Sequence, residues 1–170
     1  MKYLVVSDNH GDREILVDIL NRRQNEVDYF FHCGDSELAS NDTLFQSYNV
    51  VGGNCDFDPG FKNRLVIKTK EDTIYMTHGH LSNVRFGLTQ ISLEAKEENA
   101  TICLFGHTHQ IGCEAVKGCL YLNPGSISQP RGPIQIQSYA IIESTENNWD
   151  VQYYDRMHTA VTDLHFTYKK

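Results

Sequence analysis

Short apolar runs, each closed by glycine and polar residues, set the pattern of the first third of the chain. Residues 2–6, 29–32 and 49–51 are rich in β-branched and aromatic side chains, which predicts three strands. Between the first two, apolar residues recur at helical spacing and predict a helix from residue 12 to about residue 23, with Asp12 as its N-cap. Residues 37–45 are expected to be helical or irregular. Strands that alternate with helices indicate a sheet with parallel crossovers.

The rest of the chain contains more strands and less helix. Residues 64–69 and 73–77 predict an antiparallel pair around the polar turn 70–72, and residues 85–99 predict a helix. Further strands are expected at residues 102–105, 113–116, 119–122, 138–142 and 149–154, whereas the pattern from Met157 onward is ambiguous. A single open sheet would strain to hold so many strands. We therefore expect two mixed sheets packed face to face with helices outside, in one domain of residues 1–170.

Composition and charge narrow the class of protein. Hydrophobic residues make up 40% of the chain and charged residues 22%, as in an ordinary soluble protein. No stretch approaches the ~20 apolar residues of a membrane-spanning helix, and the N-terminus lacks the features of a signal peptide. The five cysteines form no CxxC pair and are expected to be free thiols, which fits a cytoplasmic protein. A net charge of −7, with no basic run beyond Lys169-Lys170, disfavours stable nucleic-acid binding.

Side chains that bind metals follow five of the predicted strands, each with a glycine nearby. They are Asp8 and His10, Asp35, Asn54, His78, and His107 and His109. Because ligands gather beyond the carboxyl ends of strands in α/β sheets, we expect these segments to converge. Any one of them alone has an ordinary explanation, since Asp8 could cap a helix and a lone histidine is usually structural or exposed. Seven such residues at matching positions in five segments favour a shared site.

The mixture of imidazole, carboxylate and amide groups narrows the choice of metal ion. It suits Mn²⁺, and also Fe²⁺, Zn²⁺, Ni²⁺ or Co²⁺, and it argues against an all-oxygen Ca²⁺ cage. Seven candidates are too many for one tetrahedral zinc ion. They are enough for two divalent ions that share a carboxylate and leave positions open for water and substrate.

At this point the chain shows a resemblance to a known family. The blocks Asp8-x-His10, Gly34-Asp35, Gly53-Asn54, His78 and Gly106-His107-x-His109 resemble, in order, the ligand blocks of the calcineurin-like metallophosphoesterase superfamily. Gly53-Asn54-Cys55-Asp56, His78-Gly79-His80 and Asn123-Pro124-Gly125-Ser126 are similar to its small bacterial and archaeal phosphodiesterase branch, the YfcE/YsnB-like group. The resemblance implies a four-layer α/β/β/α sandwich. It also implies that Asp8, His10 and His109 bind a first metal, that Asn54, His78 and His107 bind a second, and that Asp35 bridges them.

The resemblance further implies a hydrolase of small phosphate esters, foremost a phosphodiesterase, in which water or hydroxide between the two ions attacks phosphorus. Asn54 and Arg131 would neutralise charge on the phosphoryl oxygens, although a solvated surface role is the simpler interpretation of Arg131. Many superfamily members place a histidine after the Gly-Asn pair, and it protonates the leaving oxygen; here that residue is Cys55. Because a thiol is a poorer acid catalyst than imidazolium, we expect aryl phosphodiesters to be cleaved more readily than alkyl ones. His80 is the next candidate for the acid.

Two other functions remain open at the level of sequence. A retromer subunit of similar fold implies that such a domain can serve as a protein-binding scaffold, although that relative has lost part of the ligand set. A nuclease acting on polymeric nucleic acid is the other alternative, and the net charge of −7 counts against it. A homodimer or homotetramer is expected from the resemblance alone.

Overall fold

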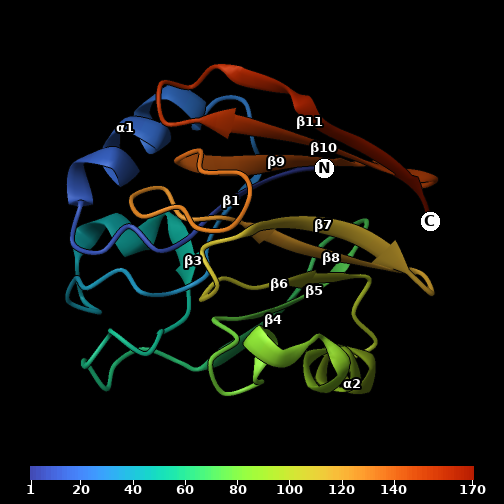
Figure 1. Cartoon of the computed structure of the whole chain (residues 1–170), viewed down its shortest axis with the longest axis horizontal. Helices are drawn as coiled ribbons and strands as arrows, with labels where there is room; N and C mark the ends of the chain where they lie inside the picture. The colour runs from blue at the N-terminus through green and yellow to red at the C-terminus, as the bar shows by residue number, and fades with distance from the viewer.

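Eleven strands form two mixed sheets, and two α-helices lie on the outer faces of these sheets (Figure 1). The computed structural model describes all 170 residues. The strands of the first sheet are β1 (Lys2–Val6), β2 (Tyr29–His32), β3 (Tyr48–Val50), β9 (Ser138–Ser144), β10 (Asn148–Asp155) and β11 (Ala160–Lys169). Their order across the sheet is β11-β10-β9-β1-β2-β3. β1, β2 and β3 are parallel to one another, whereas β9 runs antiparallel to β1.

The second sheet has five strands and the same mixed character. They are β4 (Arg64–Lys68), β5 (Thr73–Thr77), β6 (Ile102–Leu104), β7 (Ile111–Val116) and β8 (Cys119–Pro124). Their order is β4-β5-β6-β8-β7, and the central strands β5, β6 and β8 are parallel. Each sheet therefore has a parallel core whose strands end in the same direction. The loops that leave these ends are the ones on which the sequence places its metal-binding side chains.

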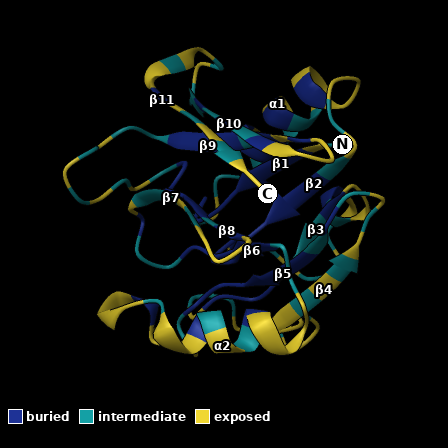
Figure 2. Ribbon diagram, turned by 90° about the vertical axis from the view of Figure 1, so that its right-hand side faces the viewer, coloured by how far each residue is buried: buried dark blue, intermediate teal, exposed yellow.

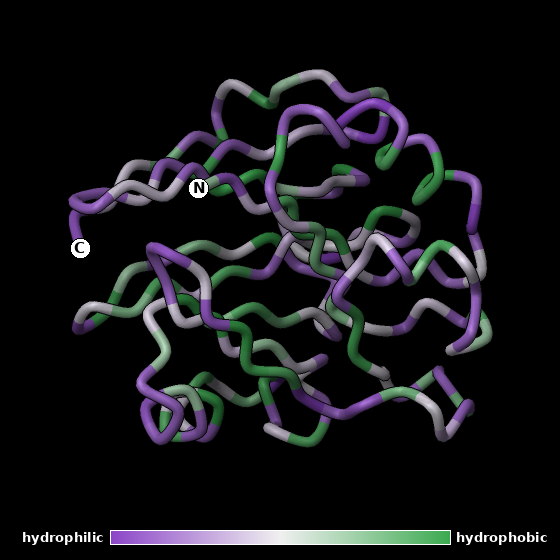
Figure 3. Tube along the Cα trace, turned by 180° about the vertical axis from the view of Figure 1, so that it is seen from behind, coloured by the Kyte–Doolittle hydropathy of each residue, from purple (hydrophilic) through white to green (hydrophobic).

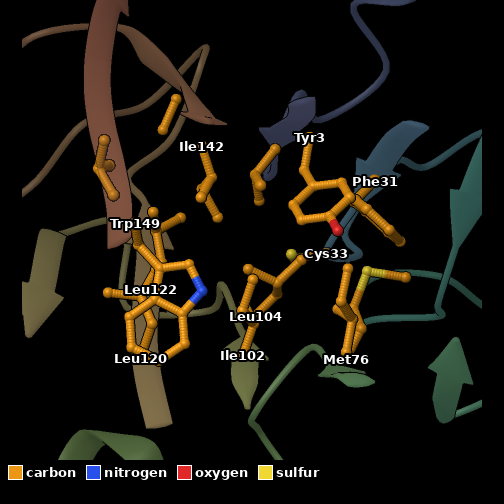
Figure 4. Close-up of a cluster of buried hydrophobic side chains, with 14 of the residues drawn as sticks. Tyr3, Phe31, Cys33, Met76, Ile102, Leu104, Leu120, Leu122, Ile142 and Trp149 are labelled. Carbon is orange, nitrogen blue, oxygen red and sulfur yellow. The ribbon is translucent and has the colours of Figure 1, made fainter. Parts of the chain in front are cut away.

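Alternate residues of β1 explain why the sheet is covered on both faces. Tyr3 and Val5 belong to the largest hydrophobic cluster, which also contains Met76 of β5 and Leu104 of β6. Figure 4 shows side chains of the two sheets meeting in this cluster. Leu4 points to the other face, so this strand is buried on both sides and forms a nearly continuous apolar run. Full burial of such a side chain typically contributes about 1.5–3 kcal/mol to folding.

The two helices complete the outer layers. Helix α1 (Arg13–Arg23) packs Ile15 and Ile19 against the first sheet, and Asp12 caps it by accepting a hydrogen bond from Ile15 N. Helix α2 (Thr89–Glu97) packs Ile91 and Ala95 against the second sheet and exposes its other side to solvent (Figure 2). Hydrophobic stretches follow the strands in the middle of the molecule, and the outer turns are mostly hydrophilic (Figure 3). The predicted four-layer α/β/β/α sandwich is confirmed.

Some boundaries differ from the prediction. The helix expected at residues 85–99 is shorter, because a 3₁₀ turn, η2 (Val84–Phe86), comes first and Gly87, with φ +131°, separates it from α2. The stretch at 37–45 is mostly irregular and ends in the 3₁₀ turn η1 (Thr43–Gln46). The ambiguous C-terminal segment forms β11, which pairs with β10 at the sheet edge. All five cysteines are free thiols. Neither helix is long and apolar enough to cross a membrane.

Asp72 lies in the predicted turn between β4 and β5, and it has a structural role that the sequence does not predict. Its carboxylate is buried and accepts hydrogen bonds from Tyr3 Oη at 3.0 Å, Trp149 Nε1 at 3.1 Å and Ser144 Oγ at 2.5 Å. Lys170 Nζ lies 2.9 Å from the same carboxylate. Burial alone would raise the pKa of Asp72, but these donors, Ser144 and Lys170 foremost, outweigh burial and lower it. Asp72 therefore ties both ends of the chain to the turn between β4 and β5.

Candidate metal centre

The loops after five strands bring the predicted ligands together where the parallel cores of the two sheets end. β1 leads to Asp8 and His10, β2 to Asp35, β3 to Asn54, β5 to His78, and β6 to His107 and His109. Two of these loops are joined along their backbones, because Asp8 N donates to Gly34 O at 3.1 Å and His10 N donates to Asp35 O at 3.1 Å. The convergence expected from the strand pattern is therefore present in the fold.

The first group of candidate ligands is Asp8, His10, Asp35 and His109, whose potential ligand atoms all lie within 4.8 Å of one another. His109 Nε2 is 3.1 Å from Asp8 Oδ1 and 3.2 Å from His10 Nε2. All but His10 are buried, and His10 is half-buried. These distances leave room for one ion among four converging ligand atoms.

The second group adjoins the first through Asp35. His78 Nε2 lies 3.3 Å from Asp35 Oδ2 and 3.2 Å from Asn54 Oδ1. The ring centroids of His78 and His107 are 5.1 Å apart. His107 also donates its backbone N–H to Asp8 Oδ2 at 3.3 Å, which connects the two groups a second time. Asp35 is thus the carboxylate that faces both groups.

Three histidines have one ring nitrogen engaged by an oxygen outside the ligand groups. The Nδ1 atom of His10 lies 2.5 Å from Glu37 Oε1. That of His78 lies 2.7 Å from Cys33 O, and that of His109 lies 2.7 Å from Gln129 O. These oxygens are acceptors, so each Nδ1 carries a proton, and each Nε2 that is not itself protonated turns a lone pair inward. The inward lone pairs then meet carboxylate and amide oxygens, which are acceptors too. Such a concentration of lone pairs requires cations, either protons or metal ions.

Burial and charge at the site fit divalent metal ions. Asp8 Oδ1 is buried and accepts no hydrogen bond, although His109 Nε2 lies 3.1 Å away, and a buried carboxylate oxygen without a donor is costly. Burial would lower the pKa of His78, but its hydrogen bond to Asp35 and the charge of Asp8 outweigh burial and raise it. Burial also opposes ionisation of Asp35, yet the contact with His78 lowers the pKa of that carboxyl. Imidazole, carboxylate and amide together form the donor set that Mn²⁺, Fe²⁺ or Zn²⁺ accepts.

Backbone strain is concentrated at this site. Ten residues other than glycine have positive φ, and six of them, with φ between 46° and 67°, are Asp8, His10, Asp35, Glu37, His107 and His109. The left-handed conformation costs an L-residue roughly 1–2 kcal/mol. Such strain persists where the surroundings over-determine the backbone, and it gathers at functional sites. Close approach also requires glycine beside the ligands, because a Cβ at Gly53 would overlap the carboxylate of Asp35.

Several residues that hold the ligands in place were not predicted. Asp56 accepts hydrogen bonds from the backbone N–H groups of Ser36, Glu37 and Gly53. It therefore fastens the loop of Asp35 to the loop of Asn54. Its place in Gly53-Asn54-Cys55-Asp56 was the only available signal, since nothing local indicates its partners. The sequence likewise predicts no role for Glu37, although its carboxylate orients the ring of His10.

Buried hydroxyl and amide groups support the ligands from behind. Ser7 Oγ donates to Asp8 Oδ2 at 2.5 Å, and Ser126 Oγ donates to Asp8 O at 2.7 Å. Asn123 Nδ2 donates to Gly106 O at 2.8 Å and so fixes the turn before His107. These hydrogen bonds place the segment that contains Asn123 and Ser126 directly behind the loops of Asp8 and His107.

The two candidates for the general acid lie in different parts of the site. Cys55 Sγ, with His10 and Glu37, belongs to a cluster whose ligand atoms lie within 4.8 Å of one another, and it accepts a hydrogen bond from Asn54 Nδ2 at 3.3 Å. Burial and the charge of Asp35 raise the pKa of Cys55 to about 11. The His80 ring lies 5.3 Å from that of His78, and its buried Nδ1 has no hydrogen-bond partner. Burial and the charge on His78 lower the pKa of His80.

Comparison with known proteins agrees with this geometry. Residues 1–147 match the Calcineurin-like phosphoesterase superfamily domain. The probable metallophosphoesterase YsnB of Bacillus subtilis is 40% identical over 164 residues, which are 96% of this chain and 96% of YsnB. The chain belongs to the calcineurin-like phosphoesterase superfamily, as the ligand blocks predicted.

Solved structures place the fold in the same group. The crystal structure of a conserved uncharacterized protein and predicted phosphoesterase from Streptococcus pneumoniae superposes with a TM-score of 0.97 at 38% identity, covering 99% of this chain and 97% of that one. The phosphoesterase YfcE from E. coli superposes with a TM-score of 0.68 at 19% identity, covering 95% of this chain and 97% of YfcE. The similarity to YfcE, at 19% identity, concerns the fold alone. A metal-dependent phosphoesterase role follows from family membership and from the potential metal-binding cluster.

Proposed function

We propose that this protein hydrolyses small phosphodiesters at a dinuclear metal centre in the cytoplasm. The first ion is assigned to Asp8, His10 and His109, the second to Asn54, His78 and His107, and Asp35 is assigned as the bridge. The observation that carries the proposal is the convergence of inward Nε2 lone pairs with carboxylate and amide oxygens around Asp35. A single ion would leave one of the two groups of acceptors without a cation.

The residues of the site perform the remaining tasks. Two divalent ions, when bound, supply an activated water and neutralise charge on the phosphoryl oxygens. Water adds its oxygen to phosphorus, the bond to the leaving oxygen breaks, and the departing alkoxide or aryloxide takes up a proton. Glu37 and the carbonyls of Cys33 and Gln129 hold the histidine rings in one tautomer. Asn54 Oδ1 lies 3.2 Å from His78 Nε2, and the amide would support a phosphoryl oxygen there.

Proton donation to the leaving group distinguishes Cys55 from His80. The Cys55 thiol holds its proton at neutral pH, and its raised pKa makes it a weak donor. Esters whose leaving group needs no proton, such as aryl diesters, should therefore react more readily than alkyl diesters. His80 remains the alternative donor, and its position beside His78 supports that assignment.

The test is a metal-reconstitution assay. Protein made without added metal is analysed for bound elements, treated with a chelator and reloaded with Mn²⁺, Fe²⁺, Zn²⁺, Ni²⁺ or Co²⁺. We expect two ions per chain and Mn²⁺-stimulated hydrolysis of bis(4-nitrophenyl) phosphate, faster than hydrolysis of 4-nitrophenyl phosphate. A protein that binds no metal and cleaves no ester would instead be a scaffold of the same fold. Cleavage of single-stranded oligonucleotides at a comparable rate would indicate a nuclease, and gel filtration would show whether the chain is a dimer or tetramer.

A further inference from the structure

A cavity of about 500 Å³ opens beside the candidate metal centre. Its volume lies within the usual range of small-molecule sites. Val84 and Phe105 provide apolar surface, while Thr108, Gln110 and Asn123 provide polar groups. Arg85 and Arg131 complete the polar part of the lining, and Ile111 and Gly112 are its remaining residues. The cavity therefore combines an apolar wall with several hydrogen-bond donors.

The charge of this cavity is opposite to that of the protein. The chain carries 22 acidic against 15 basic side chains, yet the lining contains two arginines and no acidic residue. Neither guanidinium forms an ion pair, whereas Arg13, Arg23 and Arg156 each pair with a carboxylate. Two unpaired guanidinium groups in one concave surface attract anions. The planar donor fork of arginine suits phosphate and carboxylate in particular.

The cavity is continuous with the loop that carries His107 and His109. Thr108 lies between these two histidines in the sequence, and Arg131 donates its backbone N–H to His109 O at 3.0 Å. Thr108 Oγ1 accepts from Gln110 N at 3.2 Å and from Asn123 Nδ2 at 3.0 Å, so its own proton is left to donate. A substrate held at the metal ligands would extend directly over these groups.

We propose that the cavity binds a second anionic group of the substrate, a phosphate or carboxylate, through Arg85, Arg131 and Thr108. The inference rests on the proposed function, because it takes the scissile phosphoryl group to lie at the metal ligands. The substrate is then a small molecule with two anionic groups, one of them the ester that is cleaved. The apolar surface of Val84 and Phe105 packs against the part that connects them. Dianionic substrates are preferred over otherwise identical molecules that lack the second group.

The test uses a matched pair of chromogenic diesters and Mn²⁺-loaded protein. Thymidine 5′-(4-nitrophenyl phosphate) is compared with the same compound carrying a 3′-phosphate, so the scissile bond and leaving group are identical. We expect a kcat/KM at least about tenfold higher for the 3′-phosphorylated compound, the lower end for hydrogen bonds between charged groups. R85Q and R131Q should each lower this ratio about tenfold, mainly through KM. R22Q is the matched control, because Arg22 is an exposed arginine of α1 outside the cavity, and it should keep the wild-type ratio.

A binding measurement separates this proposal from the proposed function. Thymidine 3′,5′-bisphosphate and thymidine 5′-monophosphate are titrated into Mn²⁺-loaded protein by calorimetry. Tighter binding of the bisphosphate that is lost in R85Q and R131Q supports the second anion site even if neither diester is hydrolysed, and that result would count against the proposed function alone. Hydrolysis of both diesters with equal kcat/KM, and equal binding of the two nucleotides, would overturn the second anion site and leave the proposed function intact. An equal loss on both diesters in the arginine variants would assign the arginines to the scissile phosphoryl group instead.

Discussion

Asp56 should control metal affinity although it is not a ligand. Its carboxylate accepts four hydrogen bonds, from Ser36 N at 3.3 Å, Ser36 Oγ at 3.0 Å, Glu37 N at 2.7 Å and Gly53 N at 2.8 Å. The first three donors belong to the loop of Asp35 and the fourth to the loop of Asn54. Asp56→Ala removes all four acceptor contacts, so the two loops lose the group that fixes their distance.

The expected loss of stability follows from the two shortest of these hydrogen bonds, those from Glu37 N and Gly53 N. A hydrogen bond to a charged group contributes a net of about 1.5–3 kcal/mol to stability. Because Asp56 is half-exposed, water can take the place of some of the lost hydrogen bonds in the variant, which reduces the effect. We expect Asp56→Ala to lower the free energy of unfolding by about 2–4 kcal/mol, which corresponds to a fall in Tm of roughly 5–15 °C for a chain of this size. Residues that orient metal ligands typically affect affinity about 10–100-fold, so Mn²⁺ binding should weaken by that factor.

Calorimetric titration with Mn²⁺ and thermal unfolding with and without Mn²⁺ measure both quantities. Asp58→Ala is the control, because Asp58 accepts hydrogen bonds from Ser40 N and Gly60 N farther along the same two loops and makes none with Ser36, Glu37 or Gly53 beside the candidate ligands. That variant should bind Mn²⁺ as the wild type does. If Asp56→Ala folds and binds Mn²⁺ with unchanged affinity, the loops are held by their other contacts and the reasoning fails.

Three further predictions concern the bridge, the acid and the Asp72 network. Asp35→Asn should lower Mn²⁺-dependent hydrolysis at least about 100-fold, because an amide cannot supply charge to two ions; full activity would contradict the bridging assignment. Cys55→Ala should slow alkyl diesters more than aryl diesters if the thiol is the acid, by up to about 100-fold, and an equal response of both classes would transfer the role to His80, tested with His80→Ala. Asp72→Asn should lower the free energy of unfolding by about 2–4 kcal/mol at pH 7, measured by urea titration. Because folding lowers the pKa of Asp72, the difference in unfolding free energy between the wild type and Asp72→Asn should shrink as the pH falls below about 4. A difference that stays constant with pH would refute the stabilising role of the Asp72 carboxylate.

The layered architecture could be predicted because its causes are local. Burial of β1 on both faces gives a continuous apolar run, and α1 shows helical spacing after the capping residue Asp12. The start of α2 and the structure of the C-terminal segment could not be predicted in this way. β11 is an edge strand with exposed residues alternating along its length, and its pairing with β10 stabilises it more than its own pattern does. Pairing of this kind is not visible in a segment considered alone.

The sequence by itself determined the side chains of the candidate metal centre, because ligand type and position after a strand are local properties. Asp8, Asp35 and His78 could be recognised in this way. Only the tertiary structure decided how the ligands are held and what lies beside them. Asp56 acts on residues that precede it by about twenty positions, and Arg85 and Arg131 line one cavity although they are distant in the sequence. Such contacts depend on how loops pack, and the spacing of residues along a chain carries no record of that packing.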